Sequence, residues 1–311
     1  MPIYPPILKR GDTIGIVTLG SPLAPDTIHT GISVLQSMGF QVILGDYVYA
    51  VNGFLAGTDE QRAIDLMNMF ANPKVNMILP TRGGVGVAGI LPYLDYELIS
   101  ANPKILTGYS DVSVLLNTLY QFSDLVTFSS LLLIDFKAST PAFNFNQFFE
   151  AVSTVKSPRR IQNPPGRVLT SKVVGNVTAP MVGGNLSSIT DTLGTSFEID
   201  TRGKILFLEE IHEPINKVYR MIKHLILAGK MYDCVGIVMG ECSGCPDAYG
   251  KSYNDLINEL LVPLGKPLMT NLAAAHGIYK VAVPIGALVN LNTYTSTLTV
   301  LEPTVSTITR R

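Results

Sequence analysis

Short apolar runs alternate with helix-like patterns through the first half of the chain. The β-branched run at residues 13–18 precedes a helical spacing over residues 25–38. A second helix, over residues 58–70, opens with Thr58 and has Gln61 three residues later, which is the signature of a capping box. Further strands are expected at residues 41–44, 76–79 and 105–107. This alternation predicts a parallel sheet with helices on its faces, whose ligands bind at the carboxyl ends of the strands.

The pattern changes between residues 137 and 167. This segment is polar, carries four prolines and shows no sustained periodicity, which is typical of a domain boundary. Beyond it, strands are expected near residue 173 and at 204–208 and 235–239, with an amphipathic helix over 214–228. Residues 287–302 alternate apolar and polar positions, which favours an antiparallel hairpin.

We therefore expect an α/β protein of two domains. The N-terminal domain, residues 1–145, would hold a mostly parallel sheet flanked by helices. Residues 146–172 would be a linker, and residues 173–311 a C-terminal α/β domain with a β-rich tail.

Composition and charge exclude several classes of protein. The chain has 311 residues, of which 47% are apolar and 15% charged, and this length can bury a substantial core. No run approaches the roughly 18 continuous apolar residues of a membrane-spanning helix. The 23 Lys and Arg residues nearly balance the 24 Asp and Glu residues, and no basic block occurs. Neither a nucleic acid nor a membrane is therefore expected as a partner.

The cysteines and the N-terminal residues bear on location. The chain has three cysteines, Cys234, Cys242 and Cys245, which are too few for a disulfide scaffold and fit a reducing compartment. The N-terminus lacks a basic region followed by an apolar segment, so we expect a cytoplasmic protein. The lone Cys242-x-x-Cys245 motif is interpreted as structural or incidental, because no second pair completes a zinc site.

A serine stands where an expected strand turns into a helix, in Gly108-Tyr109-Ser110-Asp111. A serine at such a turn is pushed out above the sheet, and the helix N-terminus offers the N–H of Asp111 to an oxyanion. Val112 replaces the last glycine of the usual G-x-S-x-G pattern. From these residues alone, Ser110 is either a nucleophile or a helix N-cap.

A glycine-rich segment, Thr81-Arg82-Gly83-Gly84-Val85-Gly86, follows another expected strand. Such a loop lets a ligand approach the backbone, so its N–H groups could stabilise an oxyanion or hold a phosphate. It lacks the Lys-Ser/Thr of a P-loop, and a plain tight turn is the alternative.

An activated serine needs a base and a carboxylate. Of the four histidines, His29 and His224 lie in expected helices, whereas His276 lies in a loop of small residues. Glu209 and Glu210 end an expected strand, which suits a carboxylate at a ligand site.

A metal site is the alternative for the same segment. Glu209, Glu210, His212 and Glu213 together could bind a metal ion, although their spacing matches no familiar zinc signature.

Eight short motifs occur in order along the chain. In the first half they are LKRGDTIGIV (8–17), GTDEQR (57–62), TRGG (81–84), LPYLDY (91–96) and GYSD (108–111). In the second half they are GGNL (183–186), ILFLE (205–209) and PIGA (284–287). With them the chain resembles the LD-carboxypeptidases and the related microcin C immunity proteins, a family of serine peptidases.

The resemblance implies a catalytic triad of Ser110, Glu209 and His276. It also implies backbone oxyanion donors at Asp111 and in the Gly83-Gly84 loop. The family fold is two α/β domains with the site in the cleft between them, which agrees with the boundary placed above. No metal or organic cofactor is implied, and the family often forms homodimers.

The implied substrate is a muropeptide whose terminal D-amino acid is released from an L,D-peptide bond. Arg82 is a candidate partner for the free carboxylate of that substrate. The chain departs from many relatives at Val85, where they have Tyr, and at Ser129-Ser130-Leu131, where they have His-Gly-Pro. These departures concern the substrate pocket and leave the triad positions intact.

Other functions stay open at this point. The first is an amidase that detoxifies peptidyl- or aminoacyl-nucleotide antibiotics, as the immunity relatives do. The absence of Trp weakens the hypothesis of a nucleotide-containing substrate, although Tyr and Phe also stack on adenine. The others are a binding protein without hydrolytic activity and the metal-dependent enzyme.

Overall fold

The first sheet of the computed structural model, which describes residues 1–307, has six strands in the order β12-β5-β4-β3-β1-β2. Five of them run parallel: β1 (Thr13–Val17), β2 (Gln41–Leu44), β3 (Val75–Pro80), β4 (Ile105–Gly108) and β5 (Thr127–Ser129). The sixth, β12 (Val283–Ile285), pairs antiparallel with β5. The chain thus returns to its first sheet near residue 284, long after the other five strands of that sheet.

Helices cover both faces of this sheet, because alternate side chains of each strand point to opposite faces and both sets are apolar. One face packs against α1 (Pro25–Ser37) and α5 (Ala142–Val152). The other packs against α2 (Asp59–Ala71), α3 (Tyr96–Ala101) and α4 (Val112–Ser123). The capping box that the sequence predicts is present at α2, where Thr58 and Gln61 bond to each other's backbone N–H groups.

The second sheet has eight strands in the order β6-β14-β13-β8-β9-β10-β11-β7. Its centre is parallel and consists of β8 (Asn176–Asn185), β9 (Ile205–Ile211), β10 (Gly236–Ser243) and β11 (Leu268–Leu272). Antiparallel strands flank it: β6 (Arg159–Ile161), β7 (Thr170–Val173), and the expected hairpin of β13 (Leu288–Asn292) and β14 (Thr297–Val300). The predicted α/β class, with a parallel first sheet and a β-rich tail, is confirmed.

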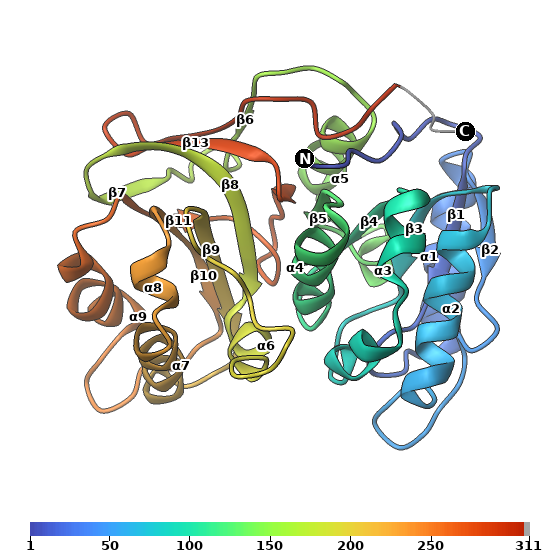
Figure 1. The fold of residues 1–311 in the computed structure, drawn as a ribbon, viewed down its shortest axis with the longest axis horizontal. Coiled ribbons are helices and arrows are strands. Elements are labelled where there is room, and N and C mark those ends of the chain that lie inside the picture. The colour runs from blue at the N-terminus through green and yellow to red at the C-terminus, as the bar shows by residue number, and fades with distance from the viewer. Residues whose placement is uncertain (308–311) are drawn as a thin grey trace.

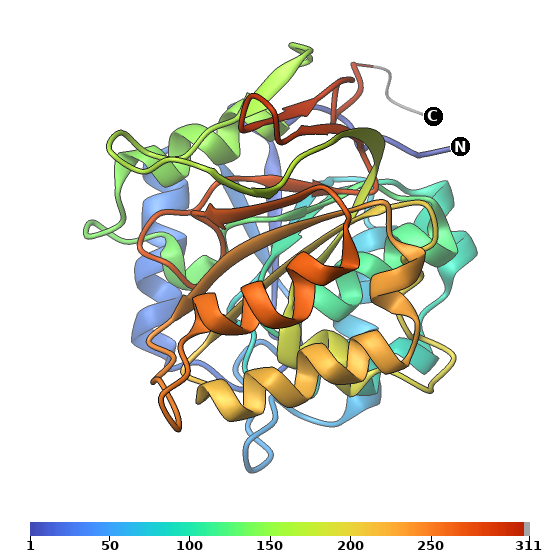
Figure 2. The same cartoon turned by 90° about the vertical axis from the view of Figure 1, so that its left-hand side faces the viewer.

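Shorter helices accompany the second sheet. They are α6 (Leu186–Asp191), α7 (Ile215–Leu227), α8 (Lys230–Asp233), α9 (Tyr253–Leu256) and the turns that follow α9 up to residue 264. Figure 2 shows α7 and the α9 region in front of the strands, on the outer face of this half. Within residues 1–307, no helix has the length and apolar character needed to span a membrane.

The segment 137–167 is more regular than its sequence indicates, because α5 and β6 lie in it. The buried residues of α5 include Asn144, Phe148 and Ala151, which do follow a helical spacing. Asn144 is polar, so its burial interrupts the apolar pattern by which the helix would be recognised. The expectation that this segment lacks periodic structure is therefore wrong.

The two halves of the molecule meet along α4, which faces the second sheet (Figure 1). Asn117 of α4 donates to the carbonyl of Gly183 and accepts from its N–H, both at 2.8 Å. The N–H of Asn185 donates to Ser113 at 3.1 Å. Gly183 must be glycine, since a Cβ there would lie 1.8 Å from the carbonyl oxygen of Phe207. These contacts hold α4, which begins beside Ser110, against β8, whose last residue pairs with Glu209.

Candidate active site

Ser110 lies at the sharp turn that the sequence predicts between β4 and α4. Its φ is 62°, a left-handed conformation that a non-glycine residue adopts at a cost, and its side chain is only partly buried. The residue capping α4 is Asp111, and no side chain caps the helix by a hydrogen bond. The N-cap interpretation of Ser110 is therefore wrong, and its hydroxyl is not engaged by the helix.

The glycine-rich loop lies directly against this turn. A Cβ on Gly83 would come within 2.8 Å of the Ser110 Cβ and 3.1 Å of the Asp111 nitrogen. The carboxylate of Asp111 accepts from the Val87 N–H at 2.7 Å, which ties the far end of the loop to the same turn. Within residues 1–307, the N–H groups of Gly83, Gly84 and Asp111 donate no hydrogen bond. Of these three predicted oxyanion donors, Gly83 and Asp111 lie beside Ser110, whereas Gly84 packs against Ser21.

A buried arginine that the sequence analysis missed supports this loop. Arg62 has a fully buried guanidinium that donates to the carbonyls of Leu19 and Gly86 and pairs with Asp59. A buried cation must satisfy its donors, and backbone carbonyls do so here. The only sequence signal for this role was the position of Arg62 in the GTDEQR motif.

Arg82 lies in the same loop, partly buried and close enough to Tyr109 for its charge to act on the phenol. Its guanidinium makes no hydrogen bond or ion pair with any residue in the described part of the chain. The donors of Arg82 are therefore available to a ligand.

Glu209 and His276 form a direct pair. His276 Nδ1 lies 2.8 Å from Glu209 Oε2, and the Glu209 side chain is 1% exposed. Glu209 comes from β9, and His276 from the loop after β11, so the second half supplies both. A buried carboxylate bonded to Nδ1 fixes the ring orientation and leaves Nε2 for chemistry.

An aromatic contact joins this pair to the serine turn. The ring of Tyr109, the residue before Ser110, packs edge-on against the His276 imidazole, with centroids 5.0 Å apart. The Tyr109 hydroxyl donates to Asp135 at 3.3 Å. Burial and the Asp135 charge raise the pKa of Tyr109 well above its usual value, so the phenol stays neutral.

Asn185 is a second residue that the sequence analysis did not assign to the site. Its Nδ2 donates to Glu209 Oε1 at 3.3 Å and to Glu210 Oε1 at 3.1 Å. Its Oδ1 accepts from the N–H of Ser188 and so caps α6. The signal lay in the GGNL motif, but only a structure shows that this amide bridges two neighbouring carboxylates.

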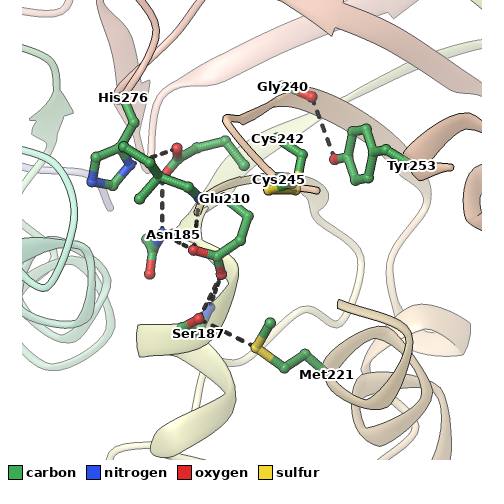
Figure 3. Close-up of a disulfide and its surroundings, with 11 residues drawn as sticks. Asn185, Ser187, Glu210, Met221, Gly240, Cys242, Cys245, Tyr253 and His276 are labelled. Carbon is green, nitrogen blue, oxygen red and sulfur yellow. Dashed lines mark hydrogen bonds and ion pairs between the residues drawn. A yellow bond between two sulfur atoms is a disulfide. The ribbon is translucent and has the colours of Figure 1, made fainter. Parts of the chain in front are cut away.

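The carboxylate of Glu210 is occupied by hydrogen bonds from neighbouring residues. Its carboxylate accepts from the N–H and hydroxyl of Ser187 at 2.8 and 2.6 Å and from the N–H of Ile211 at 2.8 Å. Figure 3 shows Glu210 beside Asn185 and pointing toward Ser187, with His276 on the other side of Asn185. Because its oxygens are already occupied by donors, Glu210 is a poor metal ligand.

The alternative metal site is not assembled. No group of three or more His, Cys, Asp or Glu side chains that could hold a metal ion occurs within residues 1–307. His212 lies on an exposed turn, and its ring packs by Gly244 rather than with the two glutamates. The remaining histidines, His29 and His224, are exposed on α1 and α7.

Cys242 and Cys245 are joined in a disulfide near Glu210 (Figure 3). The cysteine count did not predict this bond, because two cysteines three residues apart close only a local turn and build no scaffold. Cys234 is free and buried, and burial raises the pKa of its thiol to about 11. A thiol with such a pKa is not a reactive nucleophile.

Two family models match the chain. The LD-carboxypeptidase N-terminal domain matches residues 14–130, and the LD-carboxypeptidase C-terminal domain matches residues 178–291. The chain is 35% identical over 310 residues to the probable murein peptide carboxypeptidase of Bacillus subtilis, covering 97% of this chain and 95% of that protein. It is 26% identical to the microcin C7 self-immunity protein MccF of Escherichia coli, covering 98% of each.

Solved structures share the fold. The muramoyltetrapeptide carboxypeptidase from Oxalobacter formigenes superposes with a TM-score of 0.81 at 26% identity, covering 92% of this chain and 97% of that one. MccF in complex with aspartyl sulfamoyl adenosine gives a TM-score of 0.91 at 24% identity, covering 98% and 100%. The motifs, the fold and both matched domains lead to one conclusion: the chain belongs to the LD-carboxypeptidase family of peptidases.

Proposed function

We propose that the protein is a serine LD-carboxypeptidase that removes the terminal D-amino acid from a murein tetrapeptide. The observation that carries this proposal is the 2.8 Å contact of His276 Nδ1 with the buried Glu209, joined through Tyr109 to the strained serine turn. Identity of 35% to a probable murein peptide carboxypeptidase supports the substrate class.

The reaction would proceed by acyl transfer to Ser110. His276 accepts the hydroxyl proton through Nε2, since Nδ1 is bonded to Glu209, and then gives it to the leaving amine. Glu209 keeps the imidazole oriented and stabilises the imidazolium. The N–H groups of Asp111 and of the glycine loop stabilise the tetrahedral oxyanion. Water then hydrolyses the acyl-enzyme and regenerates Ser110.

Arg82 would bind the carboxylate at the end of the substrate. Its guanidinium has no partner in the described part of the chain and lies in the loop that flanks Ser110. Charge-assisted pairing with a carboxylate would place the terminal residue on the leaving-group side. The selectivity for a free C-terminus would follow from this contact.

Mass spectrometry of the tetrapeptide L-Ala-γ-D-Glu-diaminopimelyl-D-Ala tests the proposal. Wild type should release the terminal D-Ala, and Ser110→Ala should lose at least about 10⁴-fold in kcat. Ser33→Ala, on the exposed side of α1, is a control that should match wild type. Equal cleavage by wild type and Ser110→Ala would refute the nucleophile, and an inert wild type would refute the substrate.

A second candidate is hydrolysis of an aminoacyl-nucleotide antibiotic. It is favoured by the end-to-end similarity to the self-immunity protein MccF, which extends over 98% of both chains. The same triad would act on a different leaving group. Incubation with aspartyl sulfamoyl adenosine distinguishes the two candidates, because release of aspartate by wild type alone, with no cleavage of the tetrapeptide, would favour this one.

We further propose that residues 1–145 and 173–311 act as two domains joined by residues 146–172, in a cytoplasmic homodimer. The two sheets support the two domains, except that β12, within residues 173–311, belongs to the first sheet. The family resemblance supports the homodimer. Light scattering after size-exclusion chromatography tests the dimer, and a monomer of 33.6 kDa would contradict it. Cell fractionation tests the location.

A further inference from the structure

The imidazole of His276 is carried by a loop, residues 274–280, that contains neither helix nor strand. A hydrogen bond of 2.9 Å from the Val281 N–H to the Ala273 carbonyl closes its two ends. Ala275, the residue before His276, has a φ of 54°, so the backbone here is also strained. Regular secondary structure does not hold this loop, and side-chain contacts must position its histidine.

Lys280, at the end of this loop, makes three such contacts at once. Its Nζ donates to the carbonyl of Gly277, next to His276, at 2.8 Å. The same ammonium lies 3.7 Å from Asp135 Oδ1 and 5.0 Å from the centre of the Tyr109 ring. The side chain is 9% exposed, so these interactions replace its hydration.

Two of the three partners of Lys280, Asp135 and Tyr109, belong to the opposite half of the molecule. Asp135 follows β5 and is held by the Leu132 N–H at 3.0 Å and the Tyr109 hydroxyl at 3.3 Å. Tyr109 in turn packs edge-on against His276. The Lys280 ammonium therefore lies between Gly277, which follows His276, and Tyr109, which precedes Ser110.

We propose that Lys280 is a positioning residue. It keeps the imidazole of His276, from one half of the molecule, correctly placed relative to Ser110, from the other half. It acts by tying the Gly277 carbonyl to Asp135 and by fixing the Tyr109 ring that borders the imidazole. This assignment rests on the proposed function, in which His276 is the base. Lys280 itself need not touch the substrate.

A separate contact keeps the loop in place when the ammonium is removed. Asn144 of α5 accepts from the Lys280 backbone N–H at 2.9 Å and donates to the Ile278 carbonyl at 3.0 Å. These bonds involve the backbone of residues 278–280 and not the Lys280 side chain. Loss of the ammonium should thus disturb the imidazole without unfolding the loop.

The test compares Lys280→Met with Lys104→Met. Lys104 is a matched control, because it is also buried and also donates to backbone carbonyls, those of Asn72 and Val75 at 2.9 and 2.6 Å. Lys280→Met should lower kcat about 10- to 100-fold with KM unchanged, which is the effect of a misplaced catalytic group. Lys104→Met should leave both constants unchanged.

A spectroscopic readout separates this proposal from the proposed function. The His276 Nδ1–H proton that bonds to Glu209 should give a downfield NMR resonance, assigned by its loss in His276→Gln. Lys280→Met should shift or broaden this resonance, and Lys104→Met should not. The resonance can be followed even if wild type cleaves no tetrapeptide, in which case the function fails while the role of Lys280 is still decided.

Two outcomes would overturn the proposal. One is wild-type kcat together with an unchanged resonance in Lys280→Met, and the other is an equal loss of kcat in Lys104→Met. If Lys280→Met does not fold because Asp135 is left buried and unpaired, the double variant with Asp135→Asn removes that charge. The double variant should fold and show the same loss of kcat, and full activity in it would contradict the assignment.

Discussion

The turn that carries Ser110 is continuous with a strand and a helix, whereas the loop that carries His276 belongs to neither. Ser110 is placed by its own backbone, with β4 on one side, α4 on the other and Gly83 packed against it. His276 is placed by contacts with residues far away in the sequence, beginning with Glu209, 67 positions earlier. The position of the proposed nucleophile is thus set mainly by its own strand and helix, and that of the proposed base is not.

This difference predicts two kinds of sensitivity. Substitutions near Ser110 should act by crowding the turn, while substitutions near His276 should act by releasing a group that a distant side chain holds. Four variants test this difference, and their expected effects decrease from Glu209→Gln to Lys104→Met.

Glu209→Gln should have the largest effect, because it removes the charge that holds the imidazole while keeping the side-chain shape. We expect kcat to fall by about 10³- to 10⁴-fold, as when a triad carboxylate becomes an amide and the wrong tautomer is favoured. Steady-state kinetics on the tetrapeptide measures it. A loss below tenfold would show that the base does not depend on its distant partner.

Gly83→Ala tests the local side of the comparison. The added Cβ would lie 2.8 Å from the Ser110 Cβ and 3.0 Å from its Oγ, so the turn or the loop must shift. Displacing Ser110 or the glycine-rich loop in this way should lower kcat about 10²-fold. Gly203→Ala is the control for adding a methyl group without crowding, since no atom lies within 4 Å of its Cβ position. Because Gly203 has a φ of 67°, the alanine costs some stability there, so the folded variant is compared and it should retain kcat. Equal activity in both variants would mean that the glycine loop does not crowd the serine.

Arg82→Met should weaken substrate binding more than chemistry. Its guanidinium lies in the loop beside Ser110 but outside both the serine turn and the histidine loop. We expect KM to rise about tenfold with kcat little changed. A tetrapeptide amidated at its C-terminus should be a poor substrate for wild type and Arg82→Met alike. If Arg82→Met leaves KM unaltered, another group binds the carboxylate.

Lys104→Met should leave activity unchanged and alter only the pH dependence of stability. Burial lowers the pKa of Lys104 to about 8 from its usual 10.5, so folding disfavours its protonated form. The stability that the neutral amine contributes is present above pH 10.5 and is lost as the pH falls through about 8.

Relative to Lys104→Met, wild type should therefore gain about 1–2 kcal/mol of unfolding free energy between pH 7 and pH 10.5. Urea denaturation of both proteins at the two pH values measures this difference, and other titrating groups cancel in it. A constant difference would show that Lys104 is charged at no cost in the folded protein.

The same contrast explains how much of the site could be predicted from the sequence. Strand, turn and helix around Ser110 are local patterns, and the capping box at Thr58 is local too; both are present as predicted. The closeness of Glu209 and His276 was expected only through the family motifs, because no periodicity relates residues 67 positions apart. Arg62 and Asn185 were missed because the partners that tie them to the site lie on other elements. These partners are the Leu19 and Gly86 carbonyls for Arg62, and Glu209 and Glu210 for Asn185.

Buried polar groups account for the remaining differences. Asn144 interrupts the apolar spacing of α5 because it holds the backbone of the histidine loop, so the helix was taken for part of an irregular segment. Lys280 gave no signal, since a lone lysine in a loop is usually solvated. In both cases a polar residue is buried to support a neighbouring element, which a pattern of apolar positions cannot reveal.

Covalent labelling with a serine-directed fluorophosphonate tests whether Ser110 is an activated nucleophile. Wild type should gain one adduct by intact-mass spectrometry, peptide mapping should place it on Ser110, and Ser110→Ala should gain none. Glu209→Gln should be labelled far more slowly than wild type, because its serine is in place but its base is not oriented. An adduct on another residue, or equally fast labelling of Ser110→Ala, would contradict the assignment of Ser110 as the nucleophile.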